Sequence, residues 1–192
     1  MNAFRTAYLG AWLVAGCGPA DASRDAAATD SASVAVAAAE DDEHGAAGWL
    51  VTLDSVGPVR YGMPLAEVRS AFGPELVVPD VPEPACDYAS LEAGTVELLL
   101  MIVSGRVVRA DVRAGSLTTD RGAKIGDSKR RIMALYGSAV EVRPHKYVDG
   151  EYLIVSAPGD TLRRIVFETS HDTVTSFRAG RRPEVEWVEG CS

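Results

Sequence analysis

The sequence lacks the short motifs by which common enzyme classes are recognised. It contains no Gly-x-Ser-x-Gly elbow, no phosphate-binding glycine loop, no His-Glu-x-x-His and no Cys-x-x-Cys. Residues that build catalytic and metal sites are also scarce, with three histidines and three cysteines among 192 residues. The sequence therefore indicates no metal and no cofactor, and it favours a protein without catalytic activity.

Long hydrophobic runs are missing as well. An apolar stretch covers residues 7–16, but Gly18 and Pro19 end it well before the roughly 20 residues that a membrane-spanning helix needs. Arg5 is the only charged residue ahead of Cys17. A short apolar stretch behind a basic residue is typical of an export signal.

The four residues Leu13-Val14-Ala15-Gly16 in front of Cys17 resemble the lipobox of bacterial lipoproteins. This resemblance implies that residues 1–16 are a signal peptide and that acyl chains on Cys17 anchor the protein to a membrane. It places the protein in the bacterial cell envelope, on the outer-membrane or periplasmic side. An alternative stays open, because Ala20-Asp21-Ala22 is a small-x-small site at which cleavage would release a soluble secreted protein.

The stretch that follows, up to residue 48, reads as a disordered acidic linker. Seven acidic residues face a single Arg24 in residues 18–48, which accounts for −6 of the chain's net charge of −8. The stretch has too little apolar area to offset the entropy of ordering it. As a flexible chain it would hold the body about 30 Å from the membrane on average. Because the body is also net acidic, no nucleic-acid partner is expected.

The body, residues 49–192, contains an internal repeat. Residues 62–73 and residues 126–137 share a pattern of glycine, amphipathic segment and glycine. Each copy predicts a helix of about three turns with one apolar face, formed by Val68 and Phe72 in the first copy and by Ile132 and Tyr136 in the second. Pro64 is expected at the first helical position, Asp127 as an N-cap, and Gly73 and Gly137 at the helix ends.

Alternating β-branched residues after each helix predict antiparallel strands. Two hairpins are expected, residues 96–103 with 106–112 and residues 163–169 with 173–177, together with strands over residues 86–90, 139–143 and 152–156. The fold class is therefore α+β, with two tandem repeats at about 49–117 and 118–192. Each repeat is predicted to be a short helix packed on a small antiparallel sheet.

The glycine-bounded helices followed by antiparallel strands resemble the repeat of the β-lactamase-inhibitor-protein-like fold. They are similar also to small outer-membrane lipoproteins of the β-barrel assembly machinery. These resemblances imply an α+β repeat, with enzyme inhibition in the first family and barrel assembly in the second. Residues 185–192, taken with residues 144–147, also look like a group of uncharacterised bacterial exported proteins.

If the lipid occupies Cys17, the cysteines that are left are Cys86 and Cys191. In an oxidising compartment two cysteines most simply form one disulfide, which would attach the C-terminal tail near Asp87 and Tyr88. A metal-binding or catalytic thiol is the alternative, but no histidine or cysteine stands at ligand spacing from either residue.

Few other residues point to a binding or catalytic site. His145, Lys146 and Tyr147 lie in a basic and aromatic setting that would suit an anion or a glycan, although a plain loop explains them as well. A hydrolase of envelope polymers would have to gather His145 with Asp149 or Glu151.

The C-terminal region carries charged and aromatic residues of less specific meaning. Glu184 and Glu186 are expected on the solvated face of a strand. The basic residues just before them are expected to compensate charge locally, and the tryptophans at the borders of the body are expected to be core or lid residues. These residues are Arg178, Arg181, Arg182, Trp49 and Trp187.

Together these features favour a non-enzymatic envelope lipoprotein that binds a protein or cell-wall partner. A periplasmic enzyme inhibitor and a hydrolase with an unrecognised site are the alternatives.

Overall fold

The computed structural model describes Ala46, residues 48–79 and residues 85–191, all within one compact unit of the chain. The predicted signal peptide, Cys17 and most of the predicted linker lie outside the described residues. No helix in the described part is long and apolar enough to cross a membrane.

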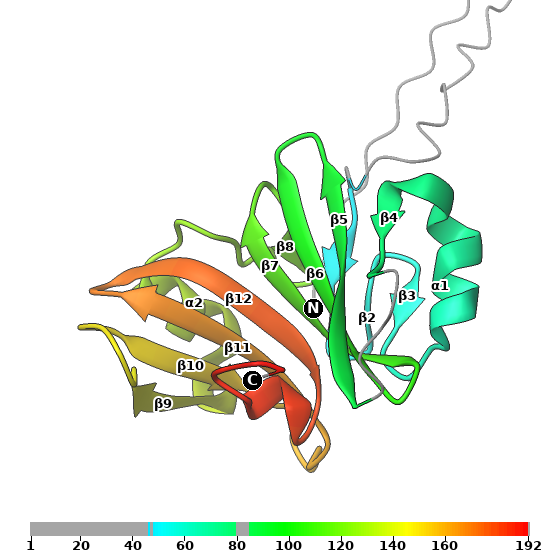
Figure 1. The fold of residues 1–192 in the computed structure, drawn as a ribbon. Coiled ribbons are helices and arrows are strands. Elements are labelled where there is room, and N and C mark those ends of the chain that lie inside the picture. Colours follow the sequence, from blue (N-terminus) through cyan, green and yellow to red (C-terminus); the bar gives the residue numbers. More distant parts are fainter. Residues whose placement is uncertain (1–45, 47, 80–84, 192) are drawn as a thin grey trace, which may run out of the picture. The chain divides into compact units, whose positions relative to one another are not determined.

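One eight-stranded antiparallel sheet dominates the body (Figure 1). Its order is β4-β5-β6-β7-β12-β11-β10-β9. The strands are β4 (Leu76–Val77), β5 (Cys86–Ala93), β6 (Val96–Val103), β7 (Arg106–Ala114), β9 (Val140–Pro144), β10 (Glu151–Val155), β11 (Arg163–Ser170) and β12 (Thr173–Arg181). Each of the seven stretches predicted as strands lies within or overlaps one of these.

The helices are α1 (Leu65–Phe72) and α2 (Lys129–Tyr136), and each runs into a 3-10 turn, η1 (Gly73–Glu75) and η2 (Gly137–Ala139). A third 3-10 helix, η3 (Glu184–Glu186), lies near the C-terminus. The α+β class predicted from the sequence is confirmed. The apolar pairs on the helices, Val68 with Phe72 and Ile132 with Tyr136, are buried as expected.

Two predicted helix starts were wrong by one residue. Pro64 is the extended N-cap of α1 and not its first helical residue. Ser128, not Asp127, caps α2, because its hydroxyl accepts a hydrogen bond from the backbone N–H of Arg131 at 3.2 Å. The predicted ends hold, since Gly73 and Gly137 both adopt φ +56°, a region that favours glycine.

The elements recur in the same order in both halves of the sheet, and each helix starts against the hairpin of its own half. Three backbone hydrogen bonds of 2.6–3.0 Å make this junction in each half. They are Gly62 N to Val107 O, Val107 N to Met63 O and Leu65 N to Gly105 O, then Gly126 N to Val174 O, Val174 N to Asp127 O and Lys129 N to Asp172 O. Descent of both halves from one duplicated unit stays a prediction.

The two halves join through β7 and β12 into one sheet, where the sequence had predicted two small ones. Ala110 lies opposite Ala179 and Arg109 opposite Gly180. A β-carbon on Gly180 would come within 2.4 Å of the carbonyl oxygen of Val108, so the central pairing requires glycine there.

Sequence patterns also missed a second, four-stranded sheet beside the first. Its order is β3-β2-β1-β8, and β1 runs parallel to β8. Each strand has two residues, too few for a period-two pattern, in β1 (Leu50–Val51), β2 (Ser55–Val56), β3 (Val59–Arg60) and β8 (Thr118–Thr119). Trp49, just before β1, packs on Phe72 of α1 with ring centroids 5.1 Å apart, in keeping with a core role.

The two faces of the large sheet are covered differently. Both helices share the main core with residues such as Phe167 and Phe177 on one face. The neighbouring residues Val166 and Arg178 point to the opposite face, where η3 and the residues around it lie. In Figure 1 this red segment lies in front of β11 and β12, whereas α2 lies behind them.

Candidate functional site

The C-terminal segment, defined here as residues 182–191, crosses the face of the sheet opposite the helices. Val185 is fully buried there and packs with Tyr152, Ile154 and Val166 of β10 and β11. The expectation of a strand around Glu184 and Glu186 was wrong. These residues form a 3-10 helix behind Pro183, so they pair with no strand of the sheet.

Arg109 of β7 holds the C-terminal segment by its main chain. Its Nη1 donates to the carbonyl oxygens of Glu184 and Trp187, at 3.0 and 2.7 Å. Its Nε and Nη2 donate to both carboxylate oxygens of Asp111, at 2.8 and 2.5 Å. The side chains of Arg109 and Asp111 are 2% and 5% exposed. A bidentate pair of this kind fixes the guanidinium plane and aims its remaining donor at the segment.

Arg178 of β12 makes a second contact to the main chain of the segment. Its Nε donates to the carbonyl oxygen of Val185 at 2.7 Å, and its Nη1 donates to the Glu168 carboxylate. Arg182 pairs with Glu186 at 3.0 Å. Of the three arginines expected to compensate local charge, these two therefore pair with acids, whereas Arg181 is exposed on the end of β12.

His145 lies in the loop between β9 and β10, close to Glu168, the same acid that pairs with Arg178. Its ring stacks on Tyr152, with centroids 4.4 Å apart. Its Nδ1 accepts hydrogen bonds from the backbone N–H groups of Tyr147 and Val148, at 3.1 and 3.3 Å. Since Nδ1 is an acceptor, the ring proton of the neutral form belongs on Nε2, which lies 3.5 Å from the Glu168 carboxylate.

Lys146 and Tyr147 contact the C-terminal segment directly. The Lys146 Nζ lies 2.5 Å from Glu189, and the Tyr147 hydroxyl donates to the same carboxylate. The structure thus brings together the two stretches that share the resemblance to exported proteins. The His145 ring faces Glu168, whereas Asp149 lies 4.0 Å from His171 and Glu151 pairs with Lys129 at 2.6 Å, so no described hydrogen bond or ion pair joins the ring to either acid proposed for a hydrolase.

The predicted disulfide between Cys86 and Cys191 is confirmed, with an S–S distance of 2.05 Å and Cα atoms 5.4 Å apart. It attaches residues 189–191, the outer end of the C-terminal segment, to the start of β5. This attachment lies beside Tyr88, as expected. Gly190 has φ +69°, and a β-carbon there would come within 2.4 Å of the Tyr88 hydroxyl. The positive φ therefore favours glycine, and a larger residue would also have to displace the Tyr88 hydroxyl.

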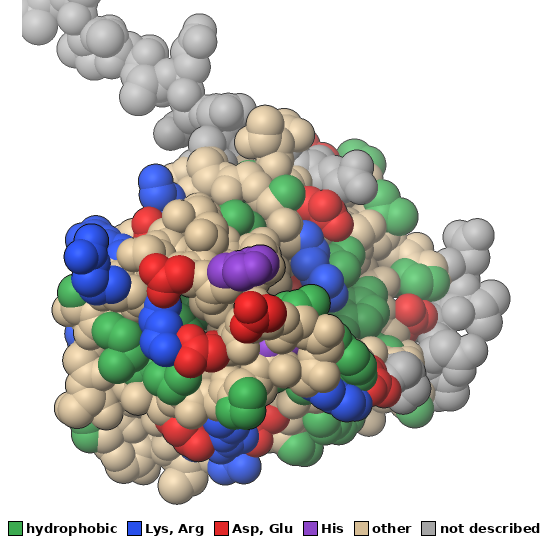
Figure 2. Space-filling model, turned by 90° about the vertical axis from the view of Figure 1, so that its left-hand side faces the viewer, with side chains coloured by type: hydrophobic (Ala, Val, Ile, Leu, Met, Phe, Trp, Pro, Cys, Tyr) green, Lys and Arg blue, Asp and Glu red, His purple; other side chains and the backbone are tan. Residues whose placement is uncertain are grey.

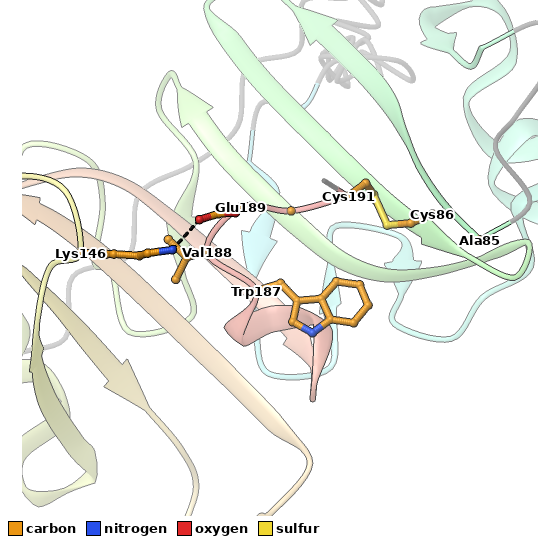
Figure 3. Close-up of a pocket in the computed structure, with 8 residues that line it drawn as sticks. Ala85, Cys86, Lys146, Trp187, Val188, Glu189 and Cys191 are labelled. Atoms are coloured by element: carbon orange, nitrogen blue, oxygen red, sulfur yellow. Dashed lines mark hydrogen bonds and ion pairs between the residues drawn. A yellow bond between two sulfur atoms is a disulfide. The ribbon is translucent and has the colours of Figure 1, made fainter.

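A cavity of about 820 Å³ lies beside the outer end of the segment. Figure 3 shows Lys146 and Glu189 on one side of it, the disulfide on the other, and the Trp187 indole between the two. The lining residue Trp187 is 37% exposed, and Tyr147, which does not line the cavity but bonds to Glu189, is 59% exposed. The lining residues are Ala85, Cys86, Lys146, Trp187, Val188, Glu189, Gly190 and Cys191.

Charge elsewhere on the surface is mixed. On the face drawn in Figure 2, basic and acidic side chains alternate with hydrophobic ones. Among the described residues, no group of three or more His, Cys, Asp or Glu side chains is arranged to hold a metal ion.

Glu189 makes the outer end of the segment sensitive to acid. Hydrogen bonds from Lys146, and then from Tyr147, hold the pKa of its carboxyl below the ordinary value of 4.5. A lowered pKa stabilises the contact fully above pH 4.5, and this stabilisation is lost as the pH falls through the lower folded-state value. We expect the amide NMR signals of Val188 and Gly190 to titrate with a midpoint below 4.5.

Two variants serve as controls for this titration experiment. Glu189→Gln should abolish it, whereas Glu67→Gln on α1 should leave it unchanged. A midpoint at or above 4.5 in the native chain would show that the carboxylate is not held by these donors.

Comparisons with known proteins show similarity in structure only. No protein-family model matches the chain, and no curated protein sequence matches it significantly. A DUF4309 family protein, YjgB of Bacillus subtilis, is 11% identical, covers 66% of this chain and 84% of its own, and has a TM-score of 0.47. The uncharacterised protein yfeY of Escherichia coli is 14% identical, covers 69% of this chain and 99% of its own, and has a TM-score of 0.46.

A third similar structure is a cysteine-rich secretory protein, SAV1118, of Staphylococcus aureus. It is 15% identical, with a TM-score of 0.36 over 64% of this chain and 44% of its own. At these scores the similarities carry no conclusion about function.

Proposed function

We propose that the protein is an envelope lipoprotein that is anchored through acyl chains on Cys17 and binds a protein or cell-wall partner without catalysing a reaction. The disulfide is the observation that carries this proposal. It uses Cys86 and Cys191, which leaves Cys17 as the one cysteine outside it. Because disulfides persist in oxidising compartments, the pairing supports export independently of the N-terminal signal.

The surface around the cavity supports binding. Tyr147 and Trp187 are 59% and 37% exposed; Tyr147 bonds to Glu189, and Trp187 lines the cavity with Lys146 and Glu189. Aromatic side chains are enriched at the centres of protein interfaces, which a polar rim surrounds. The predicted linker would give such a surface reach, because a flexible chain of that length spans about 30 Å on average.

Metabolic labelling with a palmitate analogue tests the anchor. The full chain should incorporate label and sediment with membranes, whereas Cys17→Ser should incorporate none. Label that persists in Cys17→Ser would reject lipidation at this residue. An unlabelled soluble protein that begins at Ser23 would instead assign the cleavage after Ala22.

Photo-crosslinking in intact cells tests the binding role. A photoreactive amino acid at Tyr147 or Trp187 should yield a discrete adduct with a partner protein or with cell-wall material. The matched control is Val77 on β4, which is 64% exposed but neither lines the cavity, as Trp187 does, nor bonds to Glu189, as Tyr147 does. Recovery of the monomer alone from all three positions would contradict the binding role.

A further inference from the structure

The sheet face under the C-terminal segment binds it largely through its main chain. Three main-chain carbonyl oxygens, those of Glu184, Val185 and Trp187, accept hydrogen bonds from Arg109 and Arg178. Hydrogen bonds to carbonyl groups do not depend on the identity of the side chains that follow them. A second peptide of suitable shape could therefore make the same three bonds.

Side-chain contacts restrict which peptide fits. One fully buried apolar side chain, Val185, fills the pocket between Tyr152, Ile154 and Val166. The acidic residue after it, Glu186, lies 3.9 Å from Arg164 of β11, whereas its closer partner, Arg182 at 3.0 Å, belongs to the segment itself. The face thus selects a small apolar residue followed by an acidic one, and it does so with side chains fixed on the rigid strands β7, β10, β11 and β12.

The segment is fastened more by its covalent bond than by packing. Val185 is its one fully buried apolar side chain, worth about 1.5–3 kcal/mol of burial. Its largest side chain, Trp187, stays 37% exposed, and the outer end borders a cavity of about 820 Å³. No described residue of the segment pairs with the sheet as a strand.

The two arginines that hold the main chain keep their acidic partners when the segment leaves, whereas Arg164 and Lys146 lose Glu186 and Glu189. Arg109 keeps both of its hydrogen bonds to Asp111, and Arg178 keeps its ion pair with Glu168. Only the donors that point outward, Arg109 Nη1 and Arg178 Nε, become free. These are the donors that a new peptide would need, and they would already be oriented for it.

We propose that this face is a groove for an acidic, valine-like peptide segment of a partner protein, and that the chain's own C-terminal segment fills the groove while the Cys86–Cys191 disulfide is closed. The proposal rests on the proposed binding function for its partner. Opening of the Cys86–Cys191 disulfide requires a dithiol reductant, which donates two electrons by thiol–disulfide exchange. Cys86 and Cys191 become thiols, and the reductant is released as its own disulfide.

Effective concentration explains how the disulfide controls the exchange. With the disulfide closed, the segment is held at both ends and competes with any added peptide at a very high local concentration. After reduction it is held only through β12, and its local concentration falls towards the millimolar range of a flexible tether. We therefore expect an added peptide to reach half-maximal binding at a concentration at least about tenfold lower.

The test uses a fluorescent peptide with the sequence of residues 183–190 and the full chain. Anisotropy should show little binding to the oxidised protein and saturable binding after dithiothreitol, reversed on reoxidation. The Cys86→Ser/Cys191→Ser variant should bind without reductant. A control peptide that carries Val185→Asp should not bind to either form, because its carboxylate would enter the apolar pocket.

Hydrogen exchange decides between the outcomes. The amides of residues 184–188 should lose protection after reduction while those of β7 and β12 keep it. Three results would overturn the proposal, namely persistent protection of the segment, global loss of protection, or an open segment without peptide binding. A disulfide-linked dimer would assign the groove to a second copy of this chain and would also overturn it. Crosslinking at Tyr147 and lipidation at Cys17 are measured separately, so these failures are distinguishable from failure of the proposed function.

Discussion

Replacement of Arg109 by methionine is expected to lower the free energy of unfolding by about 3–5 kcal/mol. The side chains of Arg109 and Asp111 are 2% and 5% exposed, so loss of the guanidinium leaves a buried carboxylate without a partner. The carbonyl oxygens of Glu184 and Trp187 lose their donor at the same time. Urea unfolding followed by circular dichroism measures the change.

The sheet offers a control in which an arginine also pairs with an acid two residues away on the same strand. Arg143 pairs with Glu141 on β9, but these side chains are 50% and 60% exposed. Arg143→Met should therefore cost less than about 1 kcal/mol. The double variant Arg109→Met/Asp111→Leu should regain most of the loss, because it removes the unpaired charge. An Arg109→Met protein as stable as Arg143→Met would contradict a buried pair.

The helices and long strands could be predicted because their patterns are local. Val68 with Phe72, and Ile132 with Tyr136, repeat at the helical spacing of four residues and are buried. Strand β6 matches its predicted range, residues 96–103. The continuous sheet could not be predicted in this way, because the pairing of β7 with β12 joins residues about 70 positions apart that show no shared local pattern.

The candidate site was predicted only in part, for a related reason. The cysteine count gave the disulfide, and the disulfide brought the C-terminal segment to Tyr88. Arg109 and Asp111 alternate with apolar residues on β7, a pattern that normally indicates a solvated face. The disulfide places the C-terminal segment across that strand, so the segment covers Arg109 and Asp111. With this placement known, an Arg and an Asp two residues apart on β7 indicate a buried pair.

Opening the disulfide with Cys86→Ser/Cys191→Ser is expected to lower the free energy of unfolding by about 2–5 kcal/mol. The two cysteines are 105 residues apart, so the closed loop contains most of the folded body. A chain-entropy estimate for a loop of about 100 residues is about 4.7 kcal/mol at 25 °C. Urea unfolding of the oxidised protein and of the variant measures the difference.

The slope of the urea transition shows where this loss arises. The crosslink limits the expansion of the unfolded chain, so its removal should raise the m-value while the midpoint falls. Cys17→Ser should change neither quantity, because Cys17 lies outside the disulfide. If the midpoint fell with an unchanged m-value, the loss would come from contacts of the C-terminal segment in the folded state.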